Sequence, residues 1–240
     1  MKKVILILLC FKLSAQQYKV IYKVVPTFGT LESLEAVKPE NVNFMQSLVA
    51  GSDEALKLMS YSLVVHQKLS LFEISDDETK LKNYFARISA TDDKYLIVND
   101  STYQLMNNRI AKKLAVIVPP KINWILENES KIINGYNCYK AKIELPWRNG
   151  AAMNGGKPTY FVTAWYCPKI PIKHGPKGFG NLPGLILELQ DNKVTFQATT
   201  VTFENAPIIA ENYLKDYKTI TEEKYLENIR EMAKSLKYTK

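Results

Sequence analysis

Few residues of this chain have types and spacings that could do chemistry. Its two histidines, His66 and His174, stand far apart, and neither lies in a spaced metal motif such as H-E-x-x-H. No G-x-S-x-G elbow, P-loop or dinucleotide fingerprint occurs. Because hydrolysis needs activated groups in convergent positions, we predict that the protein is not an enzyme and has no catalytic residue, cofactor or metal ion. The alternative is a hydrolase, which needs one histidine beside a nucleophile and an orienting acid.

Carboxylates occur in three places where they could matter. Asp76-Asp77 and Asp92-Asp93 are paired acids in predicted turns, where aspartate is favoured for backbone reasons, so we assign them no catalytic role. Glu188 interrupts the apolar run GLILEL and falls on the face opposite its leucines. If that face is exposed, Glu188 is an ordinary surface group. If the face lines a cavity, the carboxylate needs a lysine or arginine partner. We favour the exposed position.

Cys138 and Cys167 could form a covalent pair. They lie in the strand-like segments YNCYKAKIEL and YFVTAWYC, and the Gly-rich segment RNGAAMNGGKP between them is typical of a hairpin loop. A register that places Ala141 opposite Ala164 also places Cys138 opposite Cys167. Opposed strand residues have Cα atoms about 4.5–5.5 Å apart, which a disulfide accepts. Closing a loop of roughly 30 residues would contribute about 3–4 kcal/mol. We predict a disulfide, with two buried free thiols as the alternative.

The first residues have the order of a secretory signal peptide. Lys2 and Lys3 precede an apolar run over residues 4–11, and small residues follow at Ser14 and Ala15. The run is far shorter than the ~20 residues that span a bilayer. We therefore expect residues 1–16 to be a signal peptide and residues 17–240 to be a single domain, periplasmic or secreted, with no transmembrane helix after cleavage. An even pair of cysteines fits an oxidising compartment.

Composition limits the class of partner. A chain of 240 residues, 46% of them hydrophobic, can bury a full core. Its formal net charge is +8, but the basic residues are scattered and form no run of five or more. No nucleic-acid-binding module is visible, so we expect no nucleic-acid partner.

Alternation with a period of two residues dominates the chain and predicts strands. It is found in YKVIYKVVP, MSYSLVVHQKLSLFEI, KNYFARIS, KYLIVND, STYQLMNN, KLAVIV, YNCYKAKIEL, YFVTAWYC and GLILELQDNKVTFQATTVTF. Helical spacing is found after Pro39, ending at Gly51, and in TITEEKYLENIREMAKSL, where Thr219 and Glu222 fit a capping box. The second segment carries an apolar stripe of Tyr225, Ile229, Met232 and Leu236. We predict a mostly β (α+β) fold: a curved antiparallel sheet or half-barrel with one or two packed helices, including a C-terminal helix.

An ordered series of motifs resembles a known family. WILENESKIINGYNCYKA begins at Trp124, TAWYCPKIP follows, and GPKGFGNLPGLILEL ends at Leu189. Together they resemble the GLPGLI family of secreted proteins from Bacteroidota. The chain departs from the family in having Asn181 at the first glycine of the signature and a longer link, PWRNGAAMNGGKP, between two strands. Asparagine tolerates positive φ, so we expect the turn to be kept. The resemblance implies an exported, envelope-associated protein and supplies no reaction, since no activity is established for the family.

The segment GPKGFGNLPGLI has two interpretations. In the first it is a rigid corner between strands, stiffened by prolines and turned by glycines, and its structural signature comprises Gly175, Pro176, Asn181, Leu182, Pro183, Gly184, Leu185 and Ile186. In the second, an aromatic-rimmed surface for a ligand or partner is formed by Trp165, Tyr166, His174, Phe179 and Leu182. We favour the corner.

Two functions other than hydrolysis follow from these features. The first is a non-enzymatic binding or carrier protein that holds an apolar or peptide ligand on the concave face of the sheet, which predicts an elongated apolar cavity. The second is an interaction partner of an outer-membrane transport or surface complex, in contact through loops such as 147–158.

Overall fold

The computed structural model describes residues 17–27, 51–75, 83–106, 113–146, 159–192, 194–203, 209 and 212–237. The strands are β1 (Gln17–Pro26), β2 (Ser60–His66), β3 (Leu69–Ile74), β4 (Lys94–Val98), β5 (Ser101–Met106), β6 (Leu114–Val118), β7 (Ile125–Ile133), β8 (Tyr136–Pro146), β9 (Thr159–Cys167), β10 (Leu185–Asp191), β11 (Val194–Phe203) and β12 (Lys218–Thr221). The helices are α2 (Ser52–Leu58), α3 (Tyr84–Ala90) and α4 (Glu222–Lys237), and η5 (Pro176–Gly178) is a single 3-10 turn.

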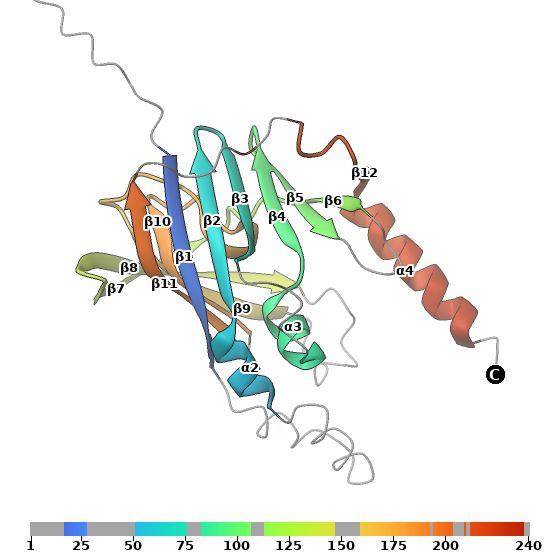
Figure 1. Ribbon diagram of the computed structural model, residues 1–240, viewed down its shortest axis with the longest axis horizontal. Helices are drawn as coiled ribbons and strands as arrows, with labels where there is room; N and C mark the ends of the chain where they lie inside the picture. Colours follow the sequence, from blue (N-terminus) through green and yellow to red (C-terminus); the bar gives the residue numbers. More distant parts are fainter. Residues whose placement is uncertain are drawn as a thin grey trace, which may run out of the picture.

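All twelve strands belong to one open sheet in the order β12-β6-β5-β4-β3-β2-β1-β11-β10-β9-β8-β7. Every pairing is antiparallel except that of β12 with β6. The sheet curves, so that β8 and β9 run almost across the direction of β1 and β2 (Figure 1). The predicted mostly β fold, with a curved antiparallel sheet and a C-terminal helix, is confirmed. Within the described residues, no helix combines the length and the apolar character needed to cross a membrane.

The inner face of the curved sheet carries the main core. Tyr22, Tyr61, Phe72 and Phe196 are fully buried there, and the rings of Tyr61 and Phe72 stack at 5.1 Å. Phe196 meets both rings edge-on, at 5.3 and 5.7 Å. The same core includes Val162 of β9, so both halves of the sheet bury one shared face. This arrangement explains the period-two alternation, because every second side chain points inward.

A second, smaller core lies on the outer face. Val64, Leu71, Leu96 and Leu105 of β2 to β5 are buried there. Ile209 is buried with them, and Tyr213, Leu214 and Tyr217 pack against the cluster. The outer face of these strands is therefore covered, whereas that of β7 to β11 carries mainly polar and charged side chains.

Helix α3 corrects one prediction. The segment KNYFARIS was expected to be a strand, but Tyr84–Ala90 is helical, and the Asn83 side chain accepts a hydrogen bond from the Ala86 amide at 3.0 Å. Ala86 and Ala90 are buried four residues apart, whereas Tyr84 is 72% exposed. The buried side of this helix is therefore formed by alanines, whereas Tyr84, which favoured a strand in the sequence, faces solvent.

The C-terminal helix begins later than the capping box predicted. Thr221, not Thr219, precedes it, and the Thr221 hydroxyl accepts a hydrogen bond from the Lys224 amide at 3.3 Å. Tyr225 packs against a small cluster on β5 and β6, but Ile229 and Met232 stay partly exposed. The predicted apolar stripe is therefore buried only at its start, and the side chain of Leu236 lies outside the described part of the structure. The helix predicted after Pro39 also falls on residues that are not described.

The connection from β9 to β10 crosses the inner face and returns. Its η5 turn contacts β3, β4 and β5, and four apolar side chains of the connection are buried, namely Ile170, Ile172, Phe179 and Leu182. Gly184 has φ 155°, and a Cβ there would lie 2.1 Å from the Cys167 carbonyl oxygen. Asn181 has φ 63°. The signature segment therefore packs inside the curved sheet as a rigid element of the core.

Candidate functional site

The structure does not bring the five predicted surface residues together. Tyr166, Phe179 and Leu182 are buried in the main core. Trp165 alternates with Tyr166 along β9, so its side chain points to the outer face, and it is partly buried against the same hydrophobic cluster. His174 lines a pocket together with Pro171 and Lys173. Tyr166, Phe179 and Leu182 are therefore too buried to form part of an accessible aromatic-rimmed surface.

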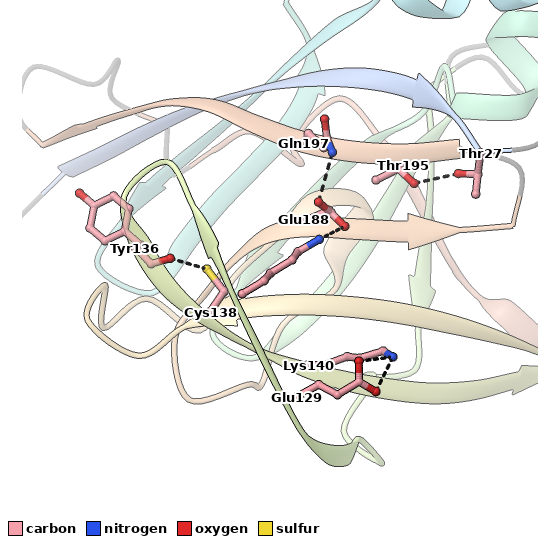
Figure 2. A network of polar contacts seen from close by, with 9 residues as sticks. Thr27, Glu129, Tyr136, Cys138, Lys140, Glu188, Thr195 and Gln197 are labelled. Carbon is pink, nitrogen blue, oxygen red and sulfur yellow. Dashed lines mark hydrogen bonds and ion pairs between the residues drawn. The ribbon is translucent and has the colours of Figure 1, made fainter.

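Trp165 is the centre of a charged cluster on the outer face, part of which is drawn in Figure 2. The Lys131 ammonium lies 4.4 Å from the centre of the Trp165 ring and 2.8 Å from a carboxylate oxygen of Glu188. Gln197 donates to the other oxygen of Glu188 at 3.2 Å. The exposed position favoured for Glu188 is wrong: its side chain is only 14% exposed, and it has the lysine partner that a covered carboxylate needs.

A second lysine extends this cluster. Lys140 lies 5.8 Å from the Trp165 ring and forms ion pairs with Glu127 at 3.1 Å and with Glu129 at 2.9 Å. The neighbouring glutamates hold both ammonium groups near the indole ring. Lys142 also pairs with Glu127, at 2.7 Å, so three lysines face three glutamates. The cluster therefore ties β7, β8, β9 and β10 together, and its charges are matched.

Cys138 and Cys167 are buried beside this cluster as free thiols. The predicted strand register is confirmed, since Tyr139 pairs with Tyr166 and Ala141 with Ala164. The predicted disulfide is absent from the structure. The alternative prediction, two buried free thiols, describes what the structure contains. Burial, together with a smaller contribution from the nearby Cys167, raises the pKa of the Cys138 thiol to about 12. A thiol held in its protonated form is a poor nucleophile.

His174 lines a pocket of about 330 Å³ at the end of the inner face. The walls come largely from the β9–β10 connection, the β2–β3 turn and the β4–β5 turn, and include Lys68, Asp100, Pro171, Lys173 and His174. We call this space the His174 pocket. It combines apolar walls with polar groups at the mouth.

A Ser70 contact orients the His174 ring. The Ser70 hydroxyl lies 3.2 Å from Nδ1 of His174. Burial lowers the pKa of His174 to about 4, although the nearby Asp100 opposes this shift. His174 is therefore neutral at physiological pH, and one ring nitrogen can donate a hydrogen bond while the other accepts one.

These groups meet only part of the requirement for a hydrolase. His174 does reach a hydroxyl, but Ser70 is only 2% exposed and is not part of the pocket wall. Among the described residues, His174 has no hydrogen bond to Asp100. His66 is on the outward side of β2, away from His174. Ser70 is accordingly placed to orient the imidazole ring and not to attack a substrate.

A second pocket adjoins the first. It has a volume of about 530 Å³ and lies between the ends of β5 and β6 and the start of α4. Asp100 and Thr102 belong to the walls of both pockets. The far wall includes Glu222, Glu223 and Arg230 of α4. We call this second space the α4 pocket, and the two adjoining pockets together the rim groove.

A buried ion pair supports the segment that forms one wall of the groove. Lys177 of η5 pairs with Asp191 at the end of β10, and these side chains are 17% and 6% exposed. Burial by itself lowers the pKa of the Lys177 ammonium, but the Asp191 carboxylate more than offsets this effect, so the pKa is raised. Lys177 therefore stays charged and holds the loop against the sheet.

Sequence reasoning identified His174 in the groove but missed Ser70, Asp100 and the Lys177–Asp191 pair. These residues are isolated in the sequence and come together only through the fold. No cluster of three or more histidine, cysteine, aspartate or glutamate side chains that could hold a metal ion occurs in the described part of the chain.

One of the comparisons with known proteins finds a family of unknown function. A family model described as "Protein of unknown function (Porph_ging)" matches residues 124–188, which extend from just before β7 into β10. The match covers roughly a quarter of the chain and does not carry the name GLPGLI. A search of curated proteins finds no match.

Two solved structures are similar to this chain. Both are structures of PNGF-II, one in space group C2 and one in space group P21, and each is 16% identical in sequence with a TM-score of 0.52. They cover 87% and 89% of this chain, but the chain spans only 31% and 33% of theirs. At this identity the similarity is evidence for the fold alone.

Proposed function

We propose that this chain is a non-enzymatic binding protein that takes an extended peptide along the rim groove. The observation that supports the proposal is that the walls of the two pockets share Asp100 and Thr102. We therefore expect one extended ligand to reach from one pocket into the other. An extended chain with alternating polar and apolar groups suits such a site better than a compact ligand does.

The rim is favoured over the interior for a physical reason. The apolar ligand of the sequence analysis was expected on the concave face of the sheet. That face is occupied by Ile170, Ile172, Phe179 and Leu182 of the β9–β10 connection. A ligand there would have to displace a packed core, whereas the rim groove is open.

The hydrolase alternative rests on one observation, the contact between Ser70 and His174. Burial of Ser70 favours a binding role, in which the imidazole ring is fixed as a hydrogen-bonding group. Ser70→Ala should therefore reduce peptide affinity, and neither the wild-type protein nor the variant should hydrolyse peptides. Hydrolysis of peptides by the wild-type protein, lost in Ser70→Ala, would support the alternative.

Export remains part of the proposal and rests on residues 1–16. Those residues and the loop 147–158, on which an outer-membrane partner was placed, lie outside the described residues. Fractionation of the native cells tests export directly. Recovery of the full-length, uncleaved chain in the cytoplasm would contradict it.

A matched pair of variants tests the binding site. Pro171 and Pro168 are both exposed on the β9–β10 connection, but only Pro171 lines the groove. The purified protein is mixed with a synthetic library of random decapeptides, and retained peptides are identified by mass spectrometry after size-exclusion separation. Pro171→Trp should block retention, whereas Pro168→Trp should not. Failure of the wild-type protein to retain any peptide, or equal retention by both variants, would contradict the proposal.

A further inference from the structure

We infer that the His174 pocket binds a carboxylate group of the peptide, so that the ligand lies with its carboxyl end at His174 and its amino end toward α4. This inference rests on the proposed function and specifies which part of the ligand each pocket binds. It is carried by the unequal distribution of charge along the rim groove.

The first step concerns the mouth of the His174 pocket. Lys68 and Lys173 both line it and are exposed, and among the described residues neither forms an ion pair. Asp100 is the single acidic residue of that wall in the part of the chain that the structure describes. Two ammonium groups without carboxylate partners attract an anion, and a carboxylate can accept from both of them.

The second step concerns the hydrogen-bonding group inside the pocket. Nδ1 of His174 faces the Ser70 hydroxyl. In the tautomer in which Ser70 donates to Nδ1, the ring proton lies on Nε2 and can be donated to a ligand oxygen. A neutral donor at this depth, with two ammonium groups at the mouth, provides hydrogen bonds and charge for a carboxylate.

The third step concerns the opposite end of the groove. Besides the shared Asp100, the described lining of the α4 pocket carries two glutamates, Glu222 and Glu223, and one arginine, Arg230. Acidic groups outnumber basic ones there, the reverse of the His174 pocket. Charge complementarity then orients a peptide, whose amino terminus is positive and whose carboxyl terminus is negative.

The experiment uses retained peptides synthesised in two forms, with a free carboxylate and with a C-terminal amide. Dissociation constants are measured by isothermal titration calorimetry. We expect the amide to bind about fivefold more weakly, in keeping with the strength of a solvent-exposed charge interaction. A third form, an amide with aspartate as its last residue, distinguishes the sources of the carboxylate. If affinity recovers in this form, the pocket also binds a side-chain carboxylate. That result supports the inference that the His174 pocket recognises a carboxylate group.

A matched charge reversal assigns the effect to the pocket. Lys173 and Lys169 are both exposed on the β9–β10 connection, but only Lys173 lines the pocket. Lys173→Glu should weaken binding of the free acid about five- to tenfold and remove its advantage over the amide, whereas Lys169→Glu should leave both unchanged. Far-ultraviolet circular dichroism confirms that both variants are folded.

Equal affinities for acid and amide, together with no effect of Lys173→Glu, would overturn the inference. If Pro171→Trp still blocked binding in that case, the groove would be a peptide site without carboxylate recognition, and the proposed function would stand. Absence of any peptide binding to the wild-type protein would overturn both.

Discussion

The buried pair of Lys177 and Asp191 allows a quantitative test of how the signature segment is held. Lys177→Met removes the ammonium and leaves the Asp191 carboxylate, whose side chain is 6% exposed, without its partner. Breaking a buried ion pair from one side costs about 3–5 kcal/mol, because an uncompensated charge stays buried. Lys177 has φ 53°, and methionine is subject to the same backbone strain there, so the substitution isolates the charge.

The assay is urea unfolding at neutral pH, followed by tryptophan fluorescence and circular dichroism. Lys177→Met should lower the free energy of unfolding by about 3–5 kcal/mol. The control is Lys113→Met, because the Lys113–Asp216 pair, at 3.3 Å, has side chains 56% and 69% exposed. We expect the control to cost less than about 1 kcal/mol.

A double variant completes the cycle. Replacing Asp191 by leucine in the Lys177→Met background removes the unpaired carboxylate and should restore most of the lost stability, since apolar groups of similar volume often replace a buried pair at little cost. The reasoning would be refuted if Lys177→Met were no more destabilising than Lys113→Met. It would also be refuted if the double variant were less stable than the single one.

Three further predictions test the pocket and the core. Burial holds the pKa of His174 at about 4, against a usual 6.5. The folded protein therefore keeps its full free energy of unfolding above pH 6.5. As the pH falls toward 4, the unfolded chain takes up a proton that the buried ring does not, and the free energy of unfolding falls by up to about 3 kcal/mol. Unfolding free energies measured across this range should show a weaker dependence in His174→Gln, and an unchanged one would count against the assignment. Gly180→Ala places a Cβ 2.3 Å from a backbone carbonyl oxygen and should cost about 3 kcal/mol, whereas Gly135→Ala, with φ 78° and open space, should cost about 1 kcal/mol in the same urea assay. Thiol labelling at mildly alkaline pH should leave Cys138 and Cys167 unmodified in the folded protein, because both are fully buried. After unfolding without reductant, both should be modified. If neither thiol is labelled after unfolding, the two cysteines are joined by a disulfide.

Local patterns were sufficient for the class of fold and for one strand register. Period-two alternation identified most strands, because a sheet with one buried face makes every second residue apolar. The pairing of β8 with β9 followed from matching Tyr139 with Tyr166 and Ala141 with Ala164, which the structure confirms. Both features depend on neighbours that are close in sequence or joined by one hairpin.

The misses have a common physical cause. Helix α3 was mistaken for a strand because two of its three large apolar residues, Tyr84 and Ile88, are exposed and its buried residues are alanines. The rim groove was missed because its walls come from three separate connections. Lys177 looked like a loop residue until the fold placed it beside Asp191. Contacts between residues distant in sequence leave no local periodicity to detect.

The position of the family-model match shows why it cannot specify a ligand. Residues 124–188 include β7 to β9 and the whole signature segment, and many of these residues pack the core or hold strands together. The same range supplies only one side of the His174 pocket, through residues such as Lys173 and His174. Lys68 and Asp100 come from turns outside it, and the α4 pocket lies almost wholly outside it. Under the proposed function, most of the residues that would contact the ligand therefore lie outside the matched segment. For this reason the substitutions in the β2–β3 turn, the β4–β5 turn and α4 are the ones that should change ligand preference without changing stability.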